Sequence, residues 1–405
     1  MKFAHIADCH IGSWREPKLR DASITAFIKA VDMCIDKGVD FILISGDLFN
    51  TSLPAVDHLK EAVERLKMLK DREIPVYVVA GSHDFSASGK TMLDVLEKAG
   101  LFVNVSGHEM VGDMVKLNFV ADKTGVNITG MIGKKGGLER EFYKKLIKEN
   151  LEAEGGYKIF MFHSAVEEFK PSDLAEMDAA PLSFLPRGFD YYAGGHVHYV
   201  FKKEEPGYGM IAFPGPCFPN NFRELEKLGR GGFYIVEVAE GKTTVEYEPI
   251  QVHNVFKILV NAEGKSPEQV EQDVLEQIKG KEFNNTIVTI RVEGKLSAGK
   301  ASDVNFKEIF DALYNKSAYF VMKNANKLTG KEFEEIKVEQ ESQEKIEDAL
   351  IKEHVGQIKA FDAAKEEQLT KALIKALDTE KQEGERVAEF EKRVIEQLQS
   401  ILLQS

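Results

Sequence analysis

The first hundred residues alternate short apolar runs with longer amphipathic segments. Strands are predicted over residues 2 to 7, over "DFILIS" at 40 to 45 and over "VYVVAG" at 76 to 81. Helices are predicted near residues 20 to 37, 54 to 70 and 90 to 99. This alternation is typical of a parallel or mixed sheet that is covered by helices.

More strands with fewer helices follow as far as residue 251. They are predicted over residues 101–105, 115–121, 126–132, 157–162, 189–193, 231–238 and 243–250. So many strands indicate two sheets packed on each other with helices outside, which is a four-layer α-β-β-α sandwich in the α/β class. We expect residues 1–251 to form this first domain.

The pattern changes near residue 252. Residues 252–330 read as strand, helix, strand, helix and strand, which predicts a small second α/β domain. Residues 331–343 are a predicted linker, and residues 344–405 a predicted helical tail. Its apolar residues recur at helical spacing: Ile346, Leu350, Val355, Ile358, Leu369, Leu373, Leu377, Val387, Phe390, Val394, Leu398 and Ile401. These stripes could fold back on the protein itself or await another chain.

Composition narrows the class of protein. Apolar residues make up 43% and charged residues 29% of the 405 residues, which are globular values. No segment reads as a membrane span or a signal peptide, and three scattered cysteines form no disulfide framework, so we expect a cytoplasmic protein with no membrane partner. The net charge of -13 argues against a surface coated with basic residues for passive nucleic-acid binding, but it leaves room for a local basic groove.

Candidate ligands follow five predicted strands. Taken singly, each could be a turn former or an ordinary histidine. Together they deliver carboxylates and imidazoles to one rim of the sheets, where α/β proteins hold their ligands. The residues are Asp8, His10, Asp47, Ser82, His83, Asp84, His163, His196 and His198, and glycines at 46, 81 and 195 let the backbone turn before them.

Carboxylates mixed with imidazoles suit Mn²⁺, Fe or Zn²⁺ better than Ca²⁺ or Mg²⁺ alone. Two such ions, about 3.5 to 4 Å apart and bridged by one carboxylate, can clamp a phosphoryl group and lower the pKa of a bound water. Cys9 adjoins the ligands but should point to the opposite face of its strand, so we assign it a structural role.

The order of these motifs resembles a known superfamily. D-x-H at 8 and 10, G-D at 46 and 47, G-S-H-D at 81 to 84, H at 163 and G-H-x-H at 195 to 198 are similar to the motifs of calcineurin-like metallophosphoesterases. Within it, "HIADCHIG", "SGDLFN" and the unit beyond residue 252 resemble the nuclease subunit of the double-strand-break repair complex. That is the Mre-eleven family, with bacterial SbcD-type relatives, here in an archaeal form.

The resemblance implies a metallophosphoesterase sandwich with a capping domain that helps to hold DNA. It also implies a manganese-dependent 3′-to-5′ exonuclease and endonuclease, a homodimer, and a partner ATPase of the ABC type from the Rad-fifty family. The predicted helices near 54–70 and 90–99 would supply part of the dimer surface, and the tail from 344 would bind the ATPase.

Site roles are carried over by motif. Asp8, His10 and His198 would hold one metal, His163 and His196 the other, and Asp47 would bridge them. His83 would contact the scissile phosphate or protonate the leaving oxygen, with Asp84 as an orienting partner. The family has asparagine where this chain has Ser82, and that asparagine supplies an oxygen to the second metal. A serine hydroxyl reaches less far, so we expect a looser second site.

Two loops beside these motifs carry candidate phosphate contacts. Arg15 and Arg20 lie in the loop 13–20 and Lys90 in the loop 85–90, although ordinary solvated loops would look the same. Two other functions share the same metal core. One is a phosphodiesterase for small nucleotides or phosphoesters, and the other is a DNA-end tether with a weakened metal site.

Overall fold

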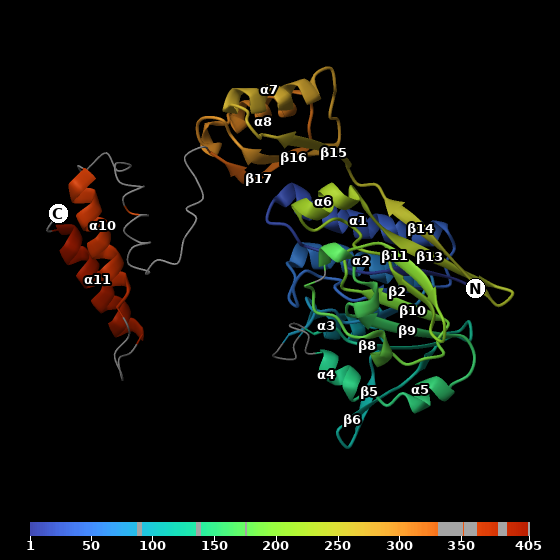
Figure 1. Ribbon diagram of the computed structural model, residues 1–405. Coiled ribbons are helices and arrows are strands. Elements are labelled where there is room, and N and C mark those ends of the chain that lie inside the picture. The colour runs from blue at the N-terminus through green and yellow to red at the C-terminus, as the bar shows by residue number, and fades with distance from the viewer. Residues whose placement is uncertain are drawn as a thin grey trace. The chain divides into compact units, whose positions relative to one another are not determined.

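The computed structural model describes residues 1–86, 91–134, 139–174, 176–330, 363–379 and 387–403, together with Ile351. It divides into two compact units, Met1–Glu332 and Phe333–Ser405, which we describe separately (Figure 1).

A six-stranded sheet forms the first inner layer, in the order β14-β13-β1-β2-β3-β4. Its strands are β1 (Lys2–Ile6), β2 (Phe41–Ser45), β3 (Val76–Val79), β4 (Val103–Asn104), β13 (Gly231–Ala239) and β14 (Lys242–Ile250). Strands β1 to β4 are parallel, and β13 and β14 join as antiparallel neighbours. The carboxyl ends of β1, β2 and β3 therefore share one edge.

A second six-stranded sheet has the order β11-β12-β10-β9-β8-β7. Its strands are β7 (Val120–Ala121), β8 (Asn127–Met131), β9 (Lys158–His163), β10 (Tyr191–Gly195), β11 (Phe201–Glu205) and β12 (Gly209–Phe213). The four central strands are parallel, and the two edge strands are antiparallel to their neighbours. The carboxyl ends of β9 and β10 therefore also lie at one edge.

The two sheets face each other through buried side chains that alternate along each strand. In β1, Phe3 points to the second sheet, where its ring meets that of Tyr191 at 5.3 Å between centroids. Ala4 and Ile6 point the other way, into a core that includes Phe27 of the first helix. This alternation is the period-two pattern of a strand buried on both faces.

Helices cover the outer face of each sheet, so the predicted four-layer α-β-β-α sandwich is confirmed (Figure 1). The first sheet is covered by α1 (Pro17–Asp36), α2 (Val56–Asp71) and α3 (Met92–Lys98). The second is covered by α4 (Glu139–Lys144), α5 (Glu149–Ala153) and the short turns η2 (Glu167–Phe169) and η4 (Leu182–Phe184). A further short turn, η3 (Ser172–Leu174), lies between η2 and η4 in the chain. Local sequence sets the helix starts: Pro17 opens α1, and Thr91 with Asp94 forms a capping box on α3.

A third sheet follows in the chain, with all three strands parallel: β15 (Asn254–Asn261), β16 (Thr286–Lys295) and β17 (Phe320–Thr329). Helices α7 (Pro267–Ile278) and α8 (Phe306–Asn315) cover one of its faces and enclose a separate core (Figure 1). On the other face, Ile287 is buried in the core that contains α1. The expected elements are present, while the domain boundary near residue 252 stays a prediction.

One predicted strand was wrong. Residues 115–121 are two strands in different sheets, because the chain leaves the hairpin of β5 (His108–Val111) and β6 (Met114–Leu117) before it enters β7. At the switch, the Asn118 N–H donates to the carbonyl of Gly107, while the Asn118 carbonyl accepts from Thr129 of β8. The strands β11 and β12 were not predicted; β11 reads "FKKEE", as charged edge strands often do.

The second unit contains α10 (Ala363–Leu377) and α11 (Val387–Leu403), which pack on each other. They carry the predicted stripes from Leu369 onward. Two predictions lie outside the described residues: the linker 331–343, and the first stripe residues Ile346, Leu350, Val355 and Ile358. Among the helices that the structure describes, none is long and apolar enough to cross a membrane.

Candidate metal centre

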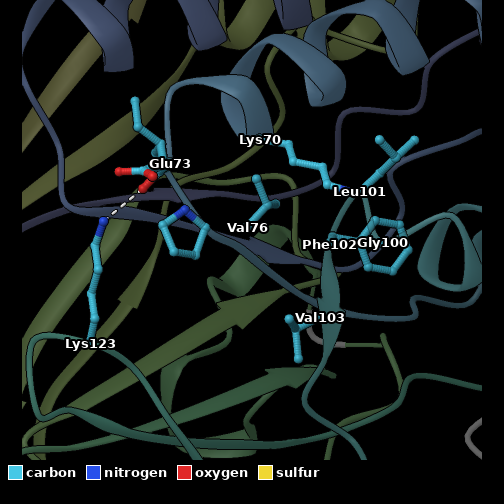
Figure 2. A pocket seen from close by; sticks show the side chains of 10 residues that line it. Lys70, Glu73, Val76, Gly100, Leu101, Phe102, Val103 and Lys123 are labelled. Atoms are coloured by element: carbon cyan, nitrogen blue, oxygen red, sulfur yellow. Dashed lines mark hydrogen bonds between the residues drawn. The ribbon is translucent and has the colours of Figure 1, made fainter.

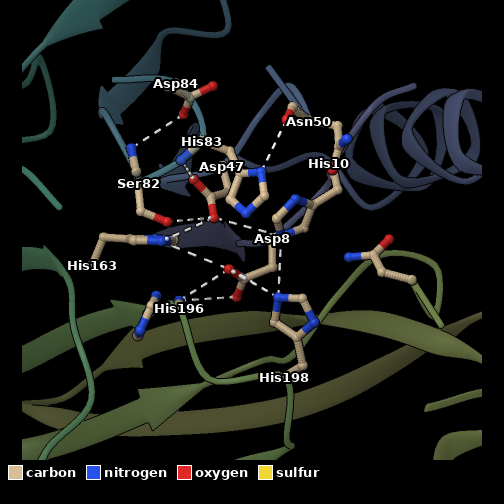
Figure 3. A network of polar contacts seen from close by, with 12 residues as sticks. Asp8, His10, Asp47, Asn50, Ser82, His83, Asp84, His163, His196 and His198 are labelled. Carbon is tan, nitrogen blue, oxygen red and sulfur yellow. Dashed lines mark hydrogen bonds and ion pairs between the residues drawn. The ribbon is translucent and has the colours of Figure 1, made fainter. Parts of the chain in front are cut away.

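Five strand ends converge on one cluster of carboxylates and imidazoles (Figure 3). The loops after β1, β2 and β3 bring Asp8 and His10, Asp47, and Ser82 to Asp84, while β9 ends in His163 and the turn after β10 carries His196 and His198. All nine predicted residues therefore belong to one neighbourhood.

Short contacts join the side chains of the cluster. His163 Nε2 lies 3.1 Å from Asp47 Oδ2, and His10 Nε2 lies 3.1 Å from His198 Nε2. Asp8 Oδ1 lies 3.7 Å from His198 Nε2. Since Asp8, Asp47 and His163 are almost completely buried, these groups interact with little screening by water.

The backbone at four of these residues is left-handed. Asp8, His10, Asp47 and His196 have φ values of 50°, 42°, 51° and 85°, a conformation that non-glycine residues seldom adopt. Hydrogen bonds between neighbouring loops hold it in place, because Asp8 N–H donates to the Gly46 carbonyl and His10 N–H to the Asp47 carbonyl. The folded sheets therefore impose the conformation that aims the ligands.

Glycines make room for the crowded ligands. A Cβ on Gly81 would lie 2.2 Å from Asp47 Oδ1, and a Cβ on Gly195 would lie 2.0 Å from the Ser45 carbonyl oxygen. The Gly81 Cβ would also lie 2.3 Å from the backbone nitrogen of Asp47, so movement of a side chain alone would relieve neither contact. The glycines before Asp47, Ser82 and His196 thus reflect a close approach of loops from different strands.

Three histidines have one ring nitrogen fixed by an acceptor outside the cluster. Nδ1 of His163 donates to the Ser45 carbonyl (2.8 Å), and Nδ1 of His83 donates to the Asn50 carbonyl (2.9 Å). Nδ1 of His198 donates to Glu224 Oε1 at 2.9 Å. Each Nε2 is then left to the cluster, which is the arrangement that metal-binding histidines show.

The contact between His163 and Asp47 requires a cation. With the proton of Nδ1 held by Ser45, a neutral His163 would turn a lone pair toward the Asp47 carboxylate at 3.1 Å. Burial lowers the pKa of His163, but Asp47 and Asp8 outweigh it and raise that pKa to about 10. Burial raises the pKa of Asp47, but His163 and His10 outweigh it and leave that pKa well below its usual range. A metal ion would supply the same positive charge.

The donor sets fit divalent ions. Three groups have ligand atoms within 4.8 Å of one another: Asp8 with His10 and His198, His10 with Asp47 and His83, and Asp8 with Asp47 and His163. Asp8 and Asp47 each belong to two groups, and none of the three contains a thiolate. This oxygen and nitrogen chemistry suits Mn²⁺, Fe or Zn²⁺.

His196 differs from the other histidines. Its backbone N–H donates to Asp8 Oδ1 at 2.9 Å, so it fixes that carboxylate. Its ring lies edge-on to the ring of His163, with 5.2 Å between centroids. Burial and the charge of His163 lower the pKa of His196 to about 3, which leaves its imidazole neutral and able to bind a metal.

Ser82 and Asp84 have different surroundings. The Ser82 hydroxyl points to Asp47 Oδ2 at 3.5 Å, so it adjoins the cluster (Figure 3). Asp84 accepts from the backbone N–H groups of Leu48, Phe49 and Gly81, and burial and Asp47 raise its pKa to about 6. It therefore ties the loops after β2 and β3 together, and the ring of His83 is held by Asn50 instead.

Two of the three predicted DNA contacts, Arg15 and Arg20, lie beside this cluster. Arg20 lies on α1 and not in the loop 13–20 as predicted, because the helix already begins at Pro17. It donates to the backbone carbonyls of Trp14 and Arg15 at 3.2 and 2.7 Å, so it braces the loop before the helix. Both arginines line a cavity of about 500 Å³ together with Asn50. Lys90 lies outside the described residues.

Sequence reasoning missed Asn50 and Glu224. Asn50 acts through its backbone carbonyl, which no residue type reveals. Glu224 lies on α6 (Phe222–Leu228), 26 residues after His198, in a stretch with no motif. Only the fold brings it to the imidazole.

A second cavity, of about 540 Å³, lies at the other end of the first sheet (Figure 2). It adjoins Pro75 and Val103, where β3 and β4 begin, whereas the cluster follows the carboxyl end of β3. Lys123 crosses part of it to donate to the Glu73 carbonyl at 2.7 Å. This cavity shares no residue with the metal cluster.

Comparison with known proteins agrees with the cluster. Residues 1–200 match the calcineurin-like phosphoesterase family. A DNA double-strand break repair protein Mre11 from Archaeoglobus fulgidus is 28% identical, covering 85% of this chain and 78% of that protein. Another Mre11, from Methanocaldococcus jannaschii, is 29% identical, with 78% and 80% covered. Among solved structures, a dimetal phosphatase from Danio rerio is 13% identical, with a TM-score of 0.41 and 62% and 96% covered. Residues 1–200 therefore form a calcineurin-like metallophosphoesterase domain, and over most of its length the chain is similar to archaeal Mre11 proteins.

Proposed function

We propose that this chain is a DNA double-strand-break repair nuclease that hydrolyses phosphodiester bonds with two divalent ions, preferably Mn²⁺. Its activities would be 3′-to-5′ exonuclease and endonuclease. One observation carries the proposal: His163 and His198 each turn Nε2 toward a buried carboxylate while an acceptor outside the cluster holds Nδ1.

The ligands divide into two sets around Asp47. Asp8, His10 and His198 would hold one ion, and His163 with His196 would hold the other, helped by the Ser82 hydroxyl. Bound ions would stabilise the charge on the phosphoryl oxygens and lower the pKa of an attacking water. The left-handed backbone and the Ser45 and Glu224 contacts keep the protein ligands in position before an ion binds.

His83 is the proposed general acid for the leaving oxygen. Its ring lies edge-on to that of His10, with 4.7 Å between centroids, so it adjoins the cluster. Since the Asn50 carbonyl holds Nδ1–H, Nε2 is the atom that would carry and deliver the proton.

We assign three proposed partners, namely DNA, a second copy of the chain and an ATPase, to separate parts of the chain. Arg15, Arg20 and Lys90 would contact DNA phosphates next to the site, and residues 252–330 would cap it. Exposed apolar residues on and before α2 and α3, Leu53, Val56 and Val95, would form part of a homodimer surface. On α10 and α11, Ile374, Leu377, Ile395 and Leu402 are exposed and would dock on a Rad-fifty-type ATPase.

The decisive experiment is nucleotide release from a 3′-labelled DNA duplex with Mn²⁺. We expect release by the parent chain and by a His108→Ala control, whose histidine lies on the exposed β5 strand, and no release by His83→Ala. If none of the three proteins cleaves DNA while all bind it, the chain is a tether. Cleavage confined to small diesters would instead indicate a small-substrate phosphodiesterase.

The partner proposals have separate tests. Deleting residues 344–405 should abolish co-purification with the ATPase while Mn²⁺ binding persists. Undiminished co-purification would remove the tail from the interface. Sedimentation at micromolar concentration should show a dimer, and a purely monomeric protein would contradict the dimer surface.

A further inference from the structure

Two matching turns build the cavity of about 540 Å³ that lies where β3 and β4 begin (Figure 2). In one turn the chain passes from α2 through Glu73 into β3, and in the other it passes from α3 through Gly100 into β4. Because β3 and β4 are parallel neighbours, both turns lie at the same end of the first sheet. Two successive helix-to-strand connections therefore enclose one space.

Hydrogen bonds hold the two turns in the same way. Glu73 and Gly100 have φ values of 59° and 66°. The residue after each of them, Ile74 in one turn and Leu101 in the other, donates its N–H to the carbonyl five residues earlier. This is the pattern of a helix that ends in a Schellman motif. A ligand would find the cavity already formed and would lose little free energy in ordering it.

The walls of the cavity are apolar and mostly aliphatic. Two runs of three residues supply them, one after each turn: Ile74, Pro75, Val76, Leu101, Phe102 and Val103. Val103 is 40% exposed on β4, the last strand of its sheet, whereas Val76 and Phe102 are buried. None of the six has a side chain that can form a hydrogen bond, so these walls suit a hydrocarbon chain better than a sugar or a nucleobase.

Two lysines bring positive charge to the rim of the cavity. Lys123 Nζ donates to the Glu73 carbonyl at 2.7 Å, and Lys70 Nζ donates to the Ala99 carbonyl at 3.3 Å. Carbonyl oxygens are neutral, so both ammonium groups keep their charge and have N–H donors left for an anion. Among the described lining residues only Glu73 carries a carboxylate, and the two ammonium groups outnumber it.

We propose that this cavity binds a medium-chain carboxylate, with its hydrocarbon chain against the apolar walls and its carboxylate at the rim that carries Lys70 and Lys123. Ligand pockets usually measure about 300–1,000 Å³, so a cavity of about 540 Å³ has room for such a molecule. Burial of the chain supplies the affinity, and the lysines favour an anion over a neutral molecule of the same length. The inference is independent of the proposed nuclease, because the cavity shares no residue with the metal cluster.

The test is calorimetric titration of the full chain with octanoate, decanoate and decanol. Decanoate should bind up to about 15-fold more tightly than octanoate, because each buried methylene group contributes about fourfold, which corresponds to ~0.8 kcal/mol. Decanoate should also bind about two- to fivefold more tightly than decanol, as is usual for a partly exposed ion pair. The proposal would be overturned by equal affinities for octanoate and decanoate, by equal affinities for decanoate and decanol, or by no binding at all.

Val103→Trp should fill the cavity and abolish decanoate binding. Val111→Trp is the matched control, because Val111 is a similarly exposed valine, 51% exposed on the strand β5, and lies outside the cavity. The control should bind decanoate as tightly as the parent. A cooperative thermal unfolding transition would show that each variant folds.

Lys123→Gln gives a second variant, at an exposed position, should Val103→Trp not fold. It should weaken decanoate binding about two- to fivefold and leave decanol binding unchanged. Lys67→Gln is its control, because Lys67 is exposed on α2 and does not line the cavity, and it should change neither affinity. Decanoate binding that persists undiminished in both Val103→Trp and Lys123→Gln would place the ligand elsewhere and overturn the proposal.

Discussion

His198 donates Nδ1–H to Glu224 at 2.9 Å, and the same ring directs Nε2 toward Asp8. Burial lowers the pKa of His198, but Glu224 and Asp8 outweigh it and raise that pKa above its ordinary value. Glu224 therefore fixes both the tautomer and the electron density of a proposed metal ligand.

Replacing Glu224 should weaken the metal site. We expect Glu224→Ala to reduce Mn²⁺ affinity about 10- to 100-fold, as is usual for second partners of ligand histidines. Glu224→Gln keeps an acceptor for Nδ1–H and should lose less. Calorimetric titration of Mn²⁺ measures both, and equal affinities in the parent and Glu224→Ala would show that His198 needs no such support.

Ser82→Asn should increase the affinity of the proposed second metal site for Mn²⁺. An amide oxygen reaches further than a hydroxyl that now lies 3.5 Å from Asp47 Oδ2, so it could bind the ion directly. The expected result is tighter binding of the second Mn²⁺ equivalent and an unchanged first. If titration curves of the two proteins superimpose, Ser82 does not limit the site.

Gly81→Ala should disrupt metal binding through one methyl group. Its Cβ would meet Asp47 Oδ1 at 2.2 Å, so either the carboxylate or the loop after β3 must move. Gly107→Ala is a suitable control because its Cβ would have no neighbour within 4 Å. We expect Mn²⁺ binding and cleavage to be lost only in the first variant; normal Mn²⁺ affinity in Gly81→Ala would contradict the packing at this loop.

The pair between Arg291 and Glu226 should anchor the third sheet to α6. Arg291 Nε lies 2.9 Å from Glu226 Oε2 and both side chains are largely buried. Arg291→Ala should lower the free energy of unfolding by about 1–3 kcal/mol, because it leaves a carboxylate without its partner. The exposed pair of Lys67 with Asp71 is the contrast, where Lys67→Ala should change stability by about 0.5 kcal/mol or less. Thermal unfolding would compare them, and equal shifts would place the Arg291 pair with ordinary surface pairs.

Acid should destabilise the protein partly through His5. Burial lowers the pKa of His5 to about 3, so below pH 6.5 the unfolded chain binds a proton that the folded chain excludes. Above pH 6.5 this difference does not lower the free energy of unfolding. As the pH falls from 6.5 toward 3 the free energy of unfolding decreases, and the loss reaches about 2 kcal/mol at pH 5. His5→Gln should therefore show a smaller drop in melting temperature between pH 7 and pH 5, and parallel drops would exclude His5 as a cause.

The cluster of candidate ligands could be predicted from the sequence because the same local pattern recurs at several strand ends. Asp8, Asp47 and His163 each follow an apolar run, and the carboxyl ends of parallel strands meet at one edge. Asn50 was not predicted because it acts through its backbone carbonyl. Glu224 was not predicted because it lies on a helix that is distant in the sequence. The switch of sheet at Asn118 escaped for a similar reason, since an apolar run shows that a strand forms but not which partner it pairs with.

Four residues of the cluster have a left-handed backbone that lowers stability but orients the side chains of the proposed site: Asp8, His10, Asp47 and His196. Each such residue costs roughly 1–2 kcal/mol relative to an ordinary conformation, and glycine would remove that strain. A laboratory selection for heat resistance alone would therefore favour glycine at the positions of the proposed metal ligands. The variants with the highest melting temperatures should therefore have no activity. The active protein should have a lower melting temperature than a glycine variant with the same fold.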